Sequence, residues 1–123
     1  MSRTLDIPLR PHTYSYGAAF ETFFINEVLR LNEYYRKNYK FSYLRIKDDA
    51  EVDLVIERAP KDYILVEIES SATIQEKDTR IIQTFFNDLK ATSAILASND
   101  PISKVFQDVN VLPWQKALER IFE

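Results

Sequence analysis

The 123-residue chain has no cysteine, and histidine and glycine each occur once, as His12 and Gly17. The lack of cysteine excludes disulfide scaffolds, thiol nucleophiles, zinc ribbons and iron–sulfur clusters. A single histidine excludes any site that needs two imidazoles, so a metal site would have to be built from oxygen ligands. The two standard phosphate-binding loops, GxxxxGK[ST] and GxGxxG, need two and three glycines. We therefore expect no nucleotide bound by either route.

Long apolar runs are also missing. The longest span only a few residues, whereas a membrane helix needs roughly 20, and Met1–Asp6 lacks the apolar core of a signal peptide. We expect no membrane association and a cytoplasmic location. The length predicts a single domain over 1–123 that can bury a core without a disulfide or zinc. Within it we expect an irregular segment over 1–16, a core over 17–97 and a C-terminal extension over 98–123.

Charge is unevenly distributed along the chain. Residues 1–47 carry eight Lys/Arg and four Asp/Glu, a net charge of +4, whereas residues 48–79 carry three and ten, a net charge of −7. The remaining 44 residues balance at five of each sign. Such runs are often only solvated surface, but ten carboxylates among predicted strands need an explanation.

Hydrophobic periodicity predicts alternating helices and strands. The predicted elements are a helix over 18–37 with Gly17 just before it, strands over 41–47, 51–57 and 63–69, a helix over 79–90, a buried strand over 93–97, a short helix over 102–106, an edge strand over 109–112 and a helix over 114–122. Turns are predicted at Asp48–Asp49 and 59–62. We predict an α/β fold with an αβββαβ core, a mixed four-stranded central sheet and flanking helices.

Acidic residues recur two apart on the second and third predicted strands. Glu51 and Asp53 share a face of their strand, and so do Glu67 and Glu69. If the two strands are adjacent, as the short turn between them implies, three or four carboxylates converge on one patch. They could be ordinary polar positions of half-exposed strands, but the third strand is otherwise apolar on both faces. Carboxylates that converge raise one another's pKa unless a cation is present. Magnesium, manganese or calcium would suit such oxygen ligands.

Four motifs in order resemble a known family. They are Gly17–Glu21, Tyr43–Arg45, Glu51–Ile56 and Val66–Ser71. Together they resemble the PD-(D/E)XK, or restriction-endonuclease-like, superfamily. Within it they are most similar to the nuclease-like C-terminal domain of unknown function that follows the ATP-binding module of many prokaryotic AAA-type ATPases.

The resemblance implies roles for individual residues. Asp53 and Glu67 would bind Mg²⁺ or Mn²⁺, with the backbone carbonyl of Ile68 as a third ligand. Glu21 would help to hold a second ion or a ligating water, and Glu51 would support Asp53. The resemblance also implies phosphodiester hydrolysis, since such an ion polarises a phosphoryl oxygen and activates water.

Position 69 departs from the family pattern. The superfamily has a lysine there, which orients the attacking water, and this chain has Glu69. Either the cation comes from another element, with Lys77 and Arg80 as candidates, or hydrolysis has been lost. The candidate catalytic residues are therefore Asp53, Glu67, Glu69 and Lys77.

Basic residues and tyrosines are interleaved from the end of the first helix into the first strand. They predict a strip that follows phosphates and stacks bases, although a solvated amphipathic helix explains them equally simply. The candidate nucleic-acid-binding residues are Arg36, Lys37, Lys40, Arg45 and Gln83. His12 is expected at the surface, and Trp114 is expected to fill the core beneath the last helix.

Two hypotheses about function follow. Glu69 favours a degenerate nuclease-like module that binds nucleic acid, a partner chain or its own copy without catalysis. The acidic set Glu21, Asp53 and Glu67 favours an active Mg²⁺- or Mn²⁺-dependent DNA endonuclease with a migrated lysine. The expected partners are DNA and an ATPase module in the same or another chain, which includes the case of a fragment of a longer ATPase.

Overall fold

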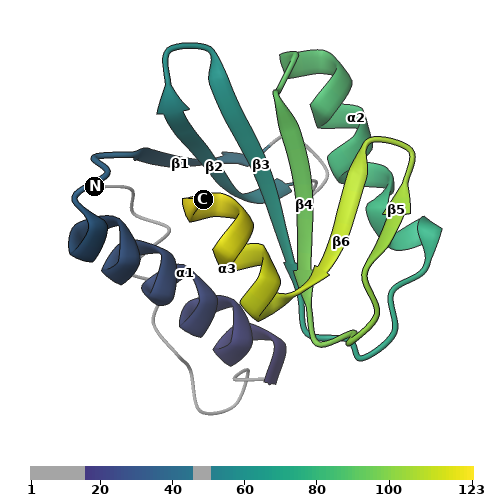
Figure 1. The fold of residues 1–123 in the computed structure, drawn as a ribbon. Coiled ribbons are helices and arrows are strands. Elements are labelled where there is room, and N and C mark those ends of the chain that lie inside the picture. The colour runs from purple at the N-terminus through teal and green to yellow at the C-terminus, as the bar shows by residue number, and fades with distance from the viewer. Residues whose placement is uncertain (1–15, 46–50) are drawn as a thin grey trace.

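A computed structural model describes residues 16–45 and 51–123 as three α-helices packed on a six-stranded mixed sheet (Figure 1). The elements are α1 (Tyr16–Tyr35), β1 (Lys40–Arg45), β2 (Glu51–Ala59), β3 (Asp62–Glu69), the short 3₁₀ helix η2 (Glu76–Thr79), α2 (Arg80–Leu89), β4 (Ser93–Ser98), β5 (Lys104–Phe106), β6 (Val109–Pro113) and α3 (Trp114–Phe122). The strand order is β1-β2-β3-β4-β6-β5. The first three strands form an antiparallel meander, β4 and β6 run parallel to β3, and β5 is antiparallel to β6.

The sheet separates two hydrophobic clusters because successive strand residues point to opposite faces. In β3, Ile64, Val66 and Ile68 pack with residues of α1 and α3 on one face. Leu65 lies between them in the sequence and packs with residues of α2 on the other. Figure 1 shows the same arrangement, with α1 and α3 side by side and α2 across the sheet. Burial on both faces explains why β3 is almost continuously apolar.

This architecture confirms the predicted α/β class and the αβββαβ order with a mixed sheet. β3 and β4 are parallel. Parallel neighbours cannot be joined by a tight turn and need a crossover connection, which α2 provides here. α1 begins at Tyr16, so Gly17 lies within the first turn of the helix, not before it.

The expectation of a four-stranded sheet was wrong, because β5 and β6 extend it to six strands. The helix expected over 102–106 is replaced by β5, and β6 is interior because β5 covers its outer edge. Gln107 between them has a left-handed backbone with φ of 54°. This conformation lets the chain reverse tightly, and glutamine there is not a usual turn signal.

The predicted turn at Asp48–Asp49 and His12 lie outside the described residues. Over the two ranges that are described, no helix is long and apolar enough to cross a membrane.

Candidate carboxylate site

A β-bulge in β2 lies at the first candidate residue, Asp53. Leu44 of β1 pairs with Val52, but Ser42 pairs with Val55, so β2 has one extra residue in this interval. As a result Val52 packs in the cluster with α2, whereas Leu54 packs in the cluster with α1 and α3. Residues two apart in a regular strand would share a face. The bulge therefore changes the direction of the side chains around Asp53, as bulges near functional sites often do.

Asp53 is held against the end of β3. Its Oδ2 accepts a hydrogen bond of 2.8 Å from the backbone N–H of Ile68. The β2–β3 register pairs Leu54 with Val66, so continuing it by one residue brings Asp53 opposite Glu67. The two carboxyl groups are hydrogen-bonded to each other, and Glu21 of α1 is hydrogen-bonded to Asp53 as well. The structure thus brings together the three acids named from the sequence.

The pKa values of both strand acids are raised. Burial, followed by the charge of Glu67, raises the pKa of Asp53 to about 8, although the Ile68 N–H opposes this. Burial also raises the pKa of Glu67 to about 7, with additional repulsion from Glu69 and Glu21, while its hydrogen bond from Asp53 acts in the opposite direction. At neutral pH, Asp53 therefore holds a proton and donates it in a hydrogen bond to Glu67.

Glu69 acts on this site as an anion. It lies two residues beyond Glu67 on the same face of β3 and is partly buried. Its Oε1 accepts a hydrogen bond of 3.4 Å from Ser71 Oγ. Because its charge raises the pKa of Glu67, Glu69 has the electrostatic effect opposite to that of the lysine that the sequence resemblance implies at this position.

The loop after Glu69 is fixed by residues that follow β4. The N–H of Asn99 donates to the carbonyl of Ser71 at 3.3 Å, and its Nδ2 donates to the carbonyl of Ser70 at 3.0 Å. These bonds connect the carboxyl ends of β3 and β4, where the acids lie.

Asp100 fixes the next part of the same loop. The residue is only 2% exposed. Its Oδ2 accepts hydrogen bonds from the N–H of Ile74 at 2.9 Å and from Lys104 Nζ at 2.6 Å, and its Oδ1 accepts one from the N–H of Ile102 at 2.9 Å. These donors, the Lys104 ammonium above all, lower the pKa of Asp100 to about 2. The pairing was not predicted from the sequence, although the two opposite charges are four residues apart.

Lys77 and Gln83 belong to the segment on the α2 side of the sheet. Lys77 is exposed in η2, and Arg80 is exposed at the start of α2. Gln83 is partly buried, and its Nε2 donates a hydrogen bond of 2.7 Å to Thr79 Oγ1. The structure therefore assigns Gln83 a partner within its own segment and separates it from the basic residues near α1.

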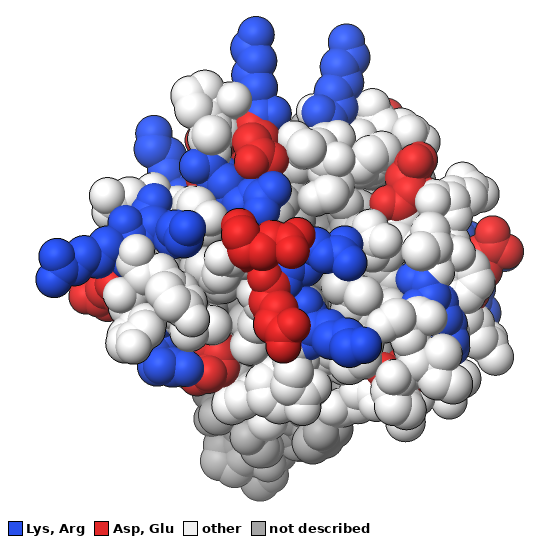
Figure 2. Space-filling model, viewed as in Figure 1, with Lys and Arg blue, Asp and Glu red and all other residues white. Residues whose placement is uncertain are grey.

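The other nucleic-acid candidates lie where α1 leads into β1. Arg36, Lys37 and Lys40 are exposed there, and Arg45 lies in β1 opposite Glu51 of β2. On the face drawn in Figure 2, blue and red side chains are interspersed and no continuous basic surface is seen. This mixture provides little support for a phosphate-tracking strip on that face.

The donors at the carboxylate site are all oxygens, which would suit Mg²⁺ or Mn²⁺. Within residues 16–45 and 51–123, however, no group of three or more His, Cys, Asp or Glu side chains is arranged so that it could hold a metal ion. Asp53 Oδ2 is also already bonded to Ile68. The acids as placed form a hydrogen-bonded pair, and a cation bound there remains a prediction from the sequence.

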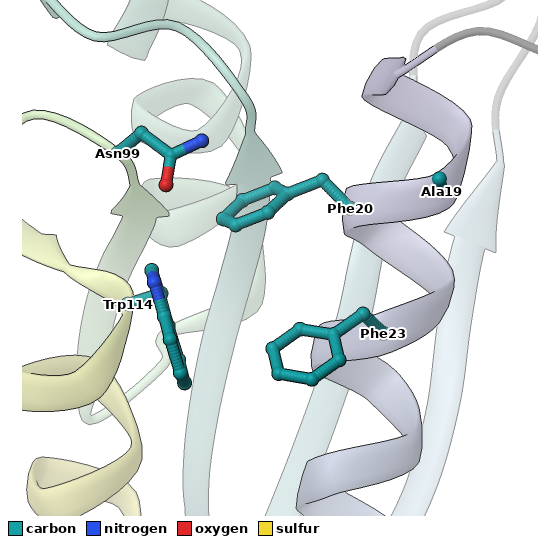
Figure 3. A pocket seen from close by; sticks show the side chains of 5 residues that line it. All are labelled: Ala19, Phe20, Phe23, Asn99 and Trp114. Atoms are coloured by element: carbon teal, nitrogen blue, oxygen red, sulfur yellow. The ribbon is translucent and has the colours of Figure 1, made fainter.

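A pocket of about 310 Å³ lies between α1 and the start of α3 (Figure 3). Its lining consists of Ala19, Phe20, Phe23, Asn99 and Trp114. The rings of Phe20 and Phe23 point from α1 toward Trp114 in Figure 3. Trp114 is partly buried and packs against the core cluster beneath α1 and α3, as expected, and it also lines this pocket. The recurrence of Phe20 and Phe23 in one helix indicated a buried face but gave no sign of a cavity.

The fold and the site define a mixed α/β domain with a pair of acids on β2 and β3. Residues 16–117 match the family described as "Domain of unknown function (DUF4143)", and the chain belongs to this family. A chain in the refined half-complex from the tetradecameric assembly of Thermococcus gammatolerans McrB AAA+ hexamers with bound McrC has a similar fold, with a TM-score of 0.55 and 12% sequence identity. The similarity covers 88% of this chain but only 34% of that one, and at this identity it concerns the fold alone. No curated protein matched the chain.

Proposed function

We propose that this domain is a restriction-endonuclease-like module that has lost phosphodiester cleavage and works by binding a partner protein in an ATPase assembly. The observation that carries the proposal is the action of Glu69 on Glu67. In the superfamily that the sequence resembles, a lysine at position 69 would steady the developing charge on phosphate. Here Glu69 repels both phosphate and hydroxide, and it helps to keep a proton on the acid pair.

The protonation of the acids supports the same conclusion. Burial is the largest cause of the raised pKa of Asp53 and Glu67, and no Lys or Arg is among the main influences on either acid. A nuclease site needs these carboxylates ionised so that they can bind a cation. A cation bound by this pair would have to displace the shared proton, so its affinity would be lower at neutral pH than at higher pH.

A protein partner is favoured over nucleic acid by the surface and by the structural similarity. The face in Figure 2 mixes charges of both signs, and phosphate binding depends on clustered cations. The similar fold occurs in an assembly of AAA+ hexamers. We propose by analogy that this domain also works beside an ATPase.

A cleavage assay tests the loss of catalysis. Duplex, single-stranded and branched DNA would be incubated with Mg²⁺ or Mn²⁺ and with wild type, Glu69→Lys or the uncharged control Glu69→Gln. We expect wild type and Glu69→Gln to leave all three substrates intact. Cleavage by Glu69→Lys alone would identify Glu69 as the inactivating residue. Cleavage by wild type that Lys77→Ala stops would overturn the proposal in favour of an active endonuclease with a migrated lysine.

A further inference from the structure

The chain between α1 and β1 presents positive charge beside two exposed tyrosines. We propose that this surface binds an acidic segment of a partner protein. We name the surface the basic turn, and it consists of Tyr34, Tyr35, Arg36, Lys37 and Lys40. The inference rests on the proposed function, because it names the surface and the chemistry by which the domain would bind its partner.

The basic turn carries charge that the fold does not neutralise. From Tyr34 to Lys47 the sequence has five Lys or Arg residues and no Asp or Glu, although the whole chain has a net charge of −3. Arg36, Lys37 and Lys40 are exposed, and no carboxylate of the described ranges forms an ion pair with any of them. Elsewhere on the face drawn in Figure 2 the two signs are interspersed. The turn is therefore a local cluster of unpaired cations, which attracts a segment of opposite charge.

Hydrogen bonds fix the shape of the turn. The N–H of Lys37 donates to the carbonyl of Asn32 at 3.0 Å. The N–H of Arg36 donates to the carbonyl of Glu33 at 3.1 Å, and the two bonds together form a Schellman motif in which Arg36 has a φ of 54°. The side chain of Asn32 also accepts a hydrogen bond of 2.9 Å from the N–H of Tyr39. Because the backbone of the turn is ordered before a partner arrives, binding does not have to order it.

Two tyrosines provide apolar surface next to the cations. Tyr34 is 73% exposed and Tyr35 is 51% exposed, and their rings meet edge to face with centroids 5.1 Å apart. Tyr39, in contrast, is partly buried and stacks on Phe122 of α3, with ring centroids 5.6 Å apart. Tyrosine is enriched at protein interfaces because its ring is apolar and its hydroxyl can form hydrogen bonds. We therefore expect the partner segment to carry an apolar side chain among its acids.

Carboxylates on both sides of the basic turn favour a short protein segment over a nucleic acid. Glu33 is exposed at the end of α1. The stacking of Tyr39 on Phe122 brings the end of α3, with the exposed Glu123, next to the turn. A nucleic acid carries a phosphate at every step, so its phosphates beyond the turn would meet these carboxylates. A segment with only a few acids can pair with the cations and avoid this repulsion.

Fluorescence anisotropy tests the binding. The probe is the fluorescein-labelled peptide Gly-Glu-Asp-Leu-Glu-Asp-Gly-amide, and the control peptide has Gln for each Glu and Asn for each Asp. We expect saturable binding of the acidic peptide in low salt, with the control peptide weaker by at least about tenfold and the affinity falling as salt is added. Equal binding of the two peptides, or no binding of the acidic peptide at about 1 mM protein, would overturn the proposal.

Variants of the basic turn locate the binding. The triple variant Arg36→Gln/Lys37→Gln/Lys40→Gln should weaken binding of the acidic peptide by about tenfold or more. Tyr34→Ala should weaken it by about threefold, since the leucine of the probe loses its apolar contact. If the triple variant unfolds, Lys37→Gln/Lys40→Gln leaves the left-handed Arg36 in place and should still weaken binding. Unaltered binding to the folded variants would place the peptide elsewhere and overturn the proposal.

A second triple variant separates local charge from net charge. Lys77→Gln/Arg80→Gln/Lys90→Gln removes the same number of positive charges from exposed positions in η2 and at the two ends of α2. It should change binding of the acidic peptide by less than about twofold, because it leaves the basic turn intact. An equal loss of affinity in both triple variants would show that the peptide responds only to net charge, which would overturn the proposal.

A labelled single-stranded oligothymidine of six nucleotides tests the other class of partner. We expect it to bind wild type more weakly than the acidic peptide does. Tighter binding of the oligonucleotide, lost in the triple variant of the basic turn, would assign the surface to nucleic acid and overturn the proposal.

These results are separate from the cleavage assay. Failure of the acidic peptide to bind, with wild type inactive on DNA, would remove the basic turn as the partner site and leave the proposed function standing. Cleavage by wild type would overturn the proposed function whatever the peptide does.

Discussion

The backbone N–H of Ile68 in β3 donates a 2.8 Å hydrogen bond to Oδ2 of Asp53 in β2. This bond stabilises the charged form of Asp53, yet burial and the nearby Glu67 outweigh it and raise the pKa to about 8. The site therefore contains an acid that is oriented by its neighbour and still protonated at neutral pH.

The first prediction concerns the pH dependence of stability. Since the folded-state pKa values of Asp53 and Glu67 lie above their ordinary values, the folded protein binds more protons than the unfolded chain between about pH 4 and pH 8. Their contribution to the free energy of unfolding is greatest at low pH and is lost as the pH rises through about 7 to 8. Between about pH 5 and pH 8.5, the free energy of unfolding should decrease less in Asp53→Asn than in wild type. We expect the two decreases to differ by at least about 1.4 kcal/mol, the equivalent of one pKa unit.

Urea denaturation at both pH values measures this difference. Asp88→Asn is the control, since Asp88 is exposed on α2. Parallel pH profiles for wild type and Asp53→Asn would show that the acid pair is not protonated in the folded state.

The second prediction concerns the metal ion expected from the sequence. Any Mg²⁺ or Mn²⁺ at Asp53 and Glu67 would have to displace the shared proton, so its affinity should be higher at about pH 8.5 than at pH 6. Calorimetric titration with Mn²⁺ should show this dependence, together with heats that change with the ionisation enthalpy of the buffer. Asp53→Asn should abolish the binding. An absence of heat at millimolar Mn²⁺ and pH 8.5 would show that the metal prediction is wrong.

The third prediction concerns the ion pair between the buried Asp100 and the partly buried Lys104. Because the folded-state pKa of Asp100 is lowered to about 2, its contribution to stability is fully present above about pH 4 and is lost as the pH falls through about 2. Asp100→Asn should lower the melting temperature at pH 7. The difference in melting temperature between wild type and this variant should become smaller as the pH falls from about 4 to about 2. The exposed Asp108→Asn is the control, and a constant gap across this range would contradict the assignment.

Periodicity was sufficient to predict the three α-helices, the first four strands and β6, because each buries an apolar face whose spacing follows its own geometry. It did not predict β5, because a strand of three residues is too short to show an alternating pattern. The position of β5 is fixed instead by long-range contacts, since Lys104 Nζ donates hydrogen bonds to Asp100 and to the carbonyl of Ile74. The convergence of Asp53 and Glu67 followed from strand pairing. The bulge at Asp53 and the pocket at Trp114 depend on packing between segments far apart in the chain, which a local pattern does not report.

With a single glycine in the chain, left-handed backbone positions are occupied by residues that carry a Cβ. Five described residues other than glycine have positive φ, namely Arg36, Asn38, Lys61, Lys90 and Gln107. Lys90 ends α2 with φ of 53° and ψ of 46°, the left-handed position that glycine usually occupies. Since a residue with a Cβ is strained there, Lys90→Gly should raise the free energy of unfolding by about 0.5–1 kcal/mol. Lys116→Gly, at an exposed position within α3, should lower it by about 1 kcal/mol. Urea denaturation of both variants compares the two, and destabilisation by Lys90→Gly would show that the lysine makes contacts worth more than the strain.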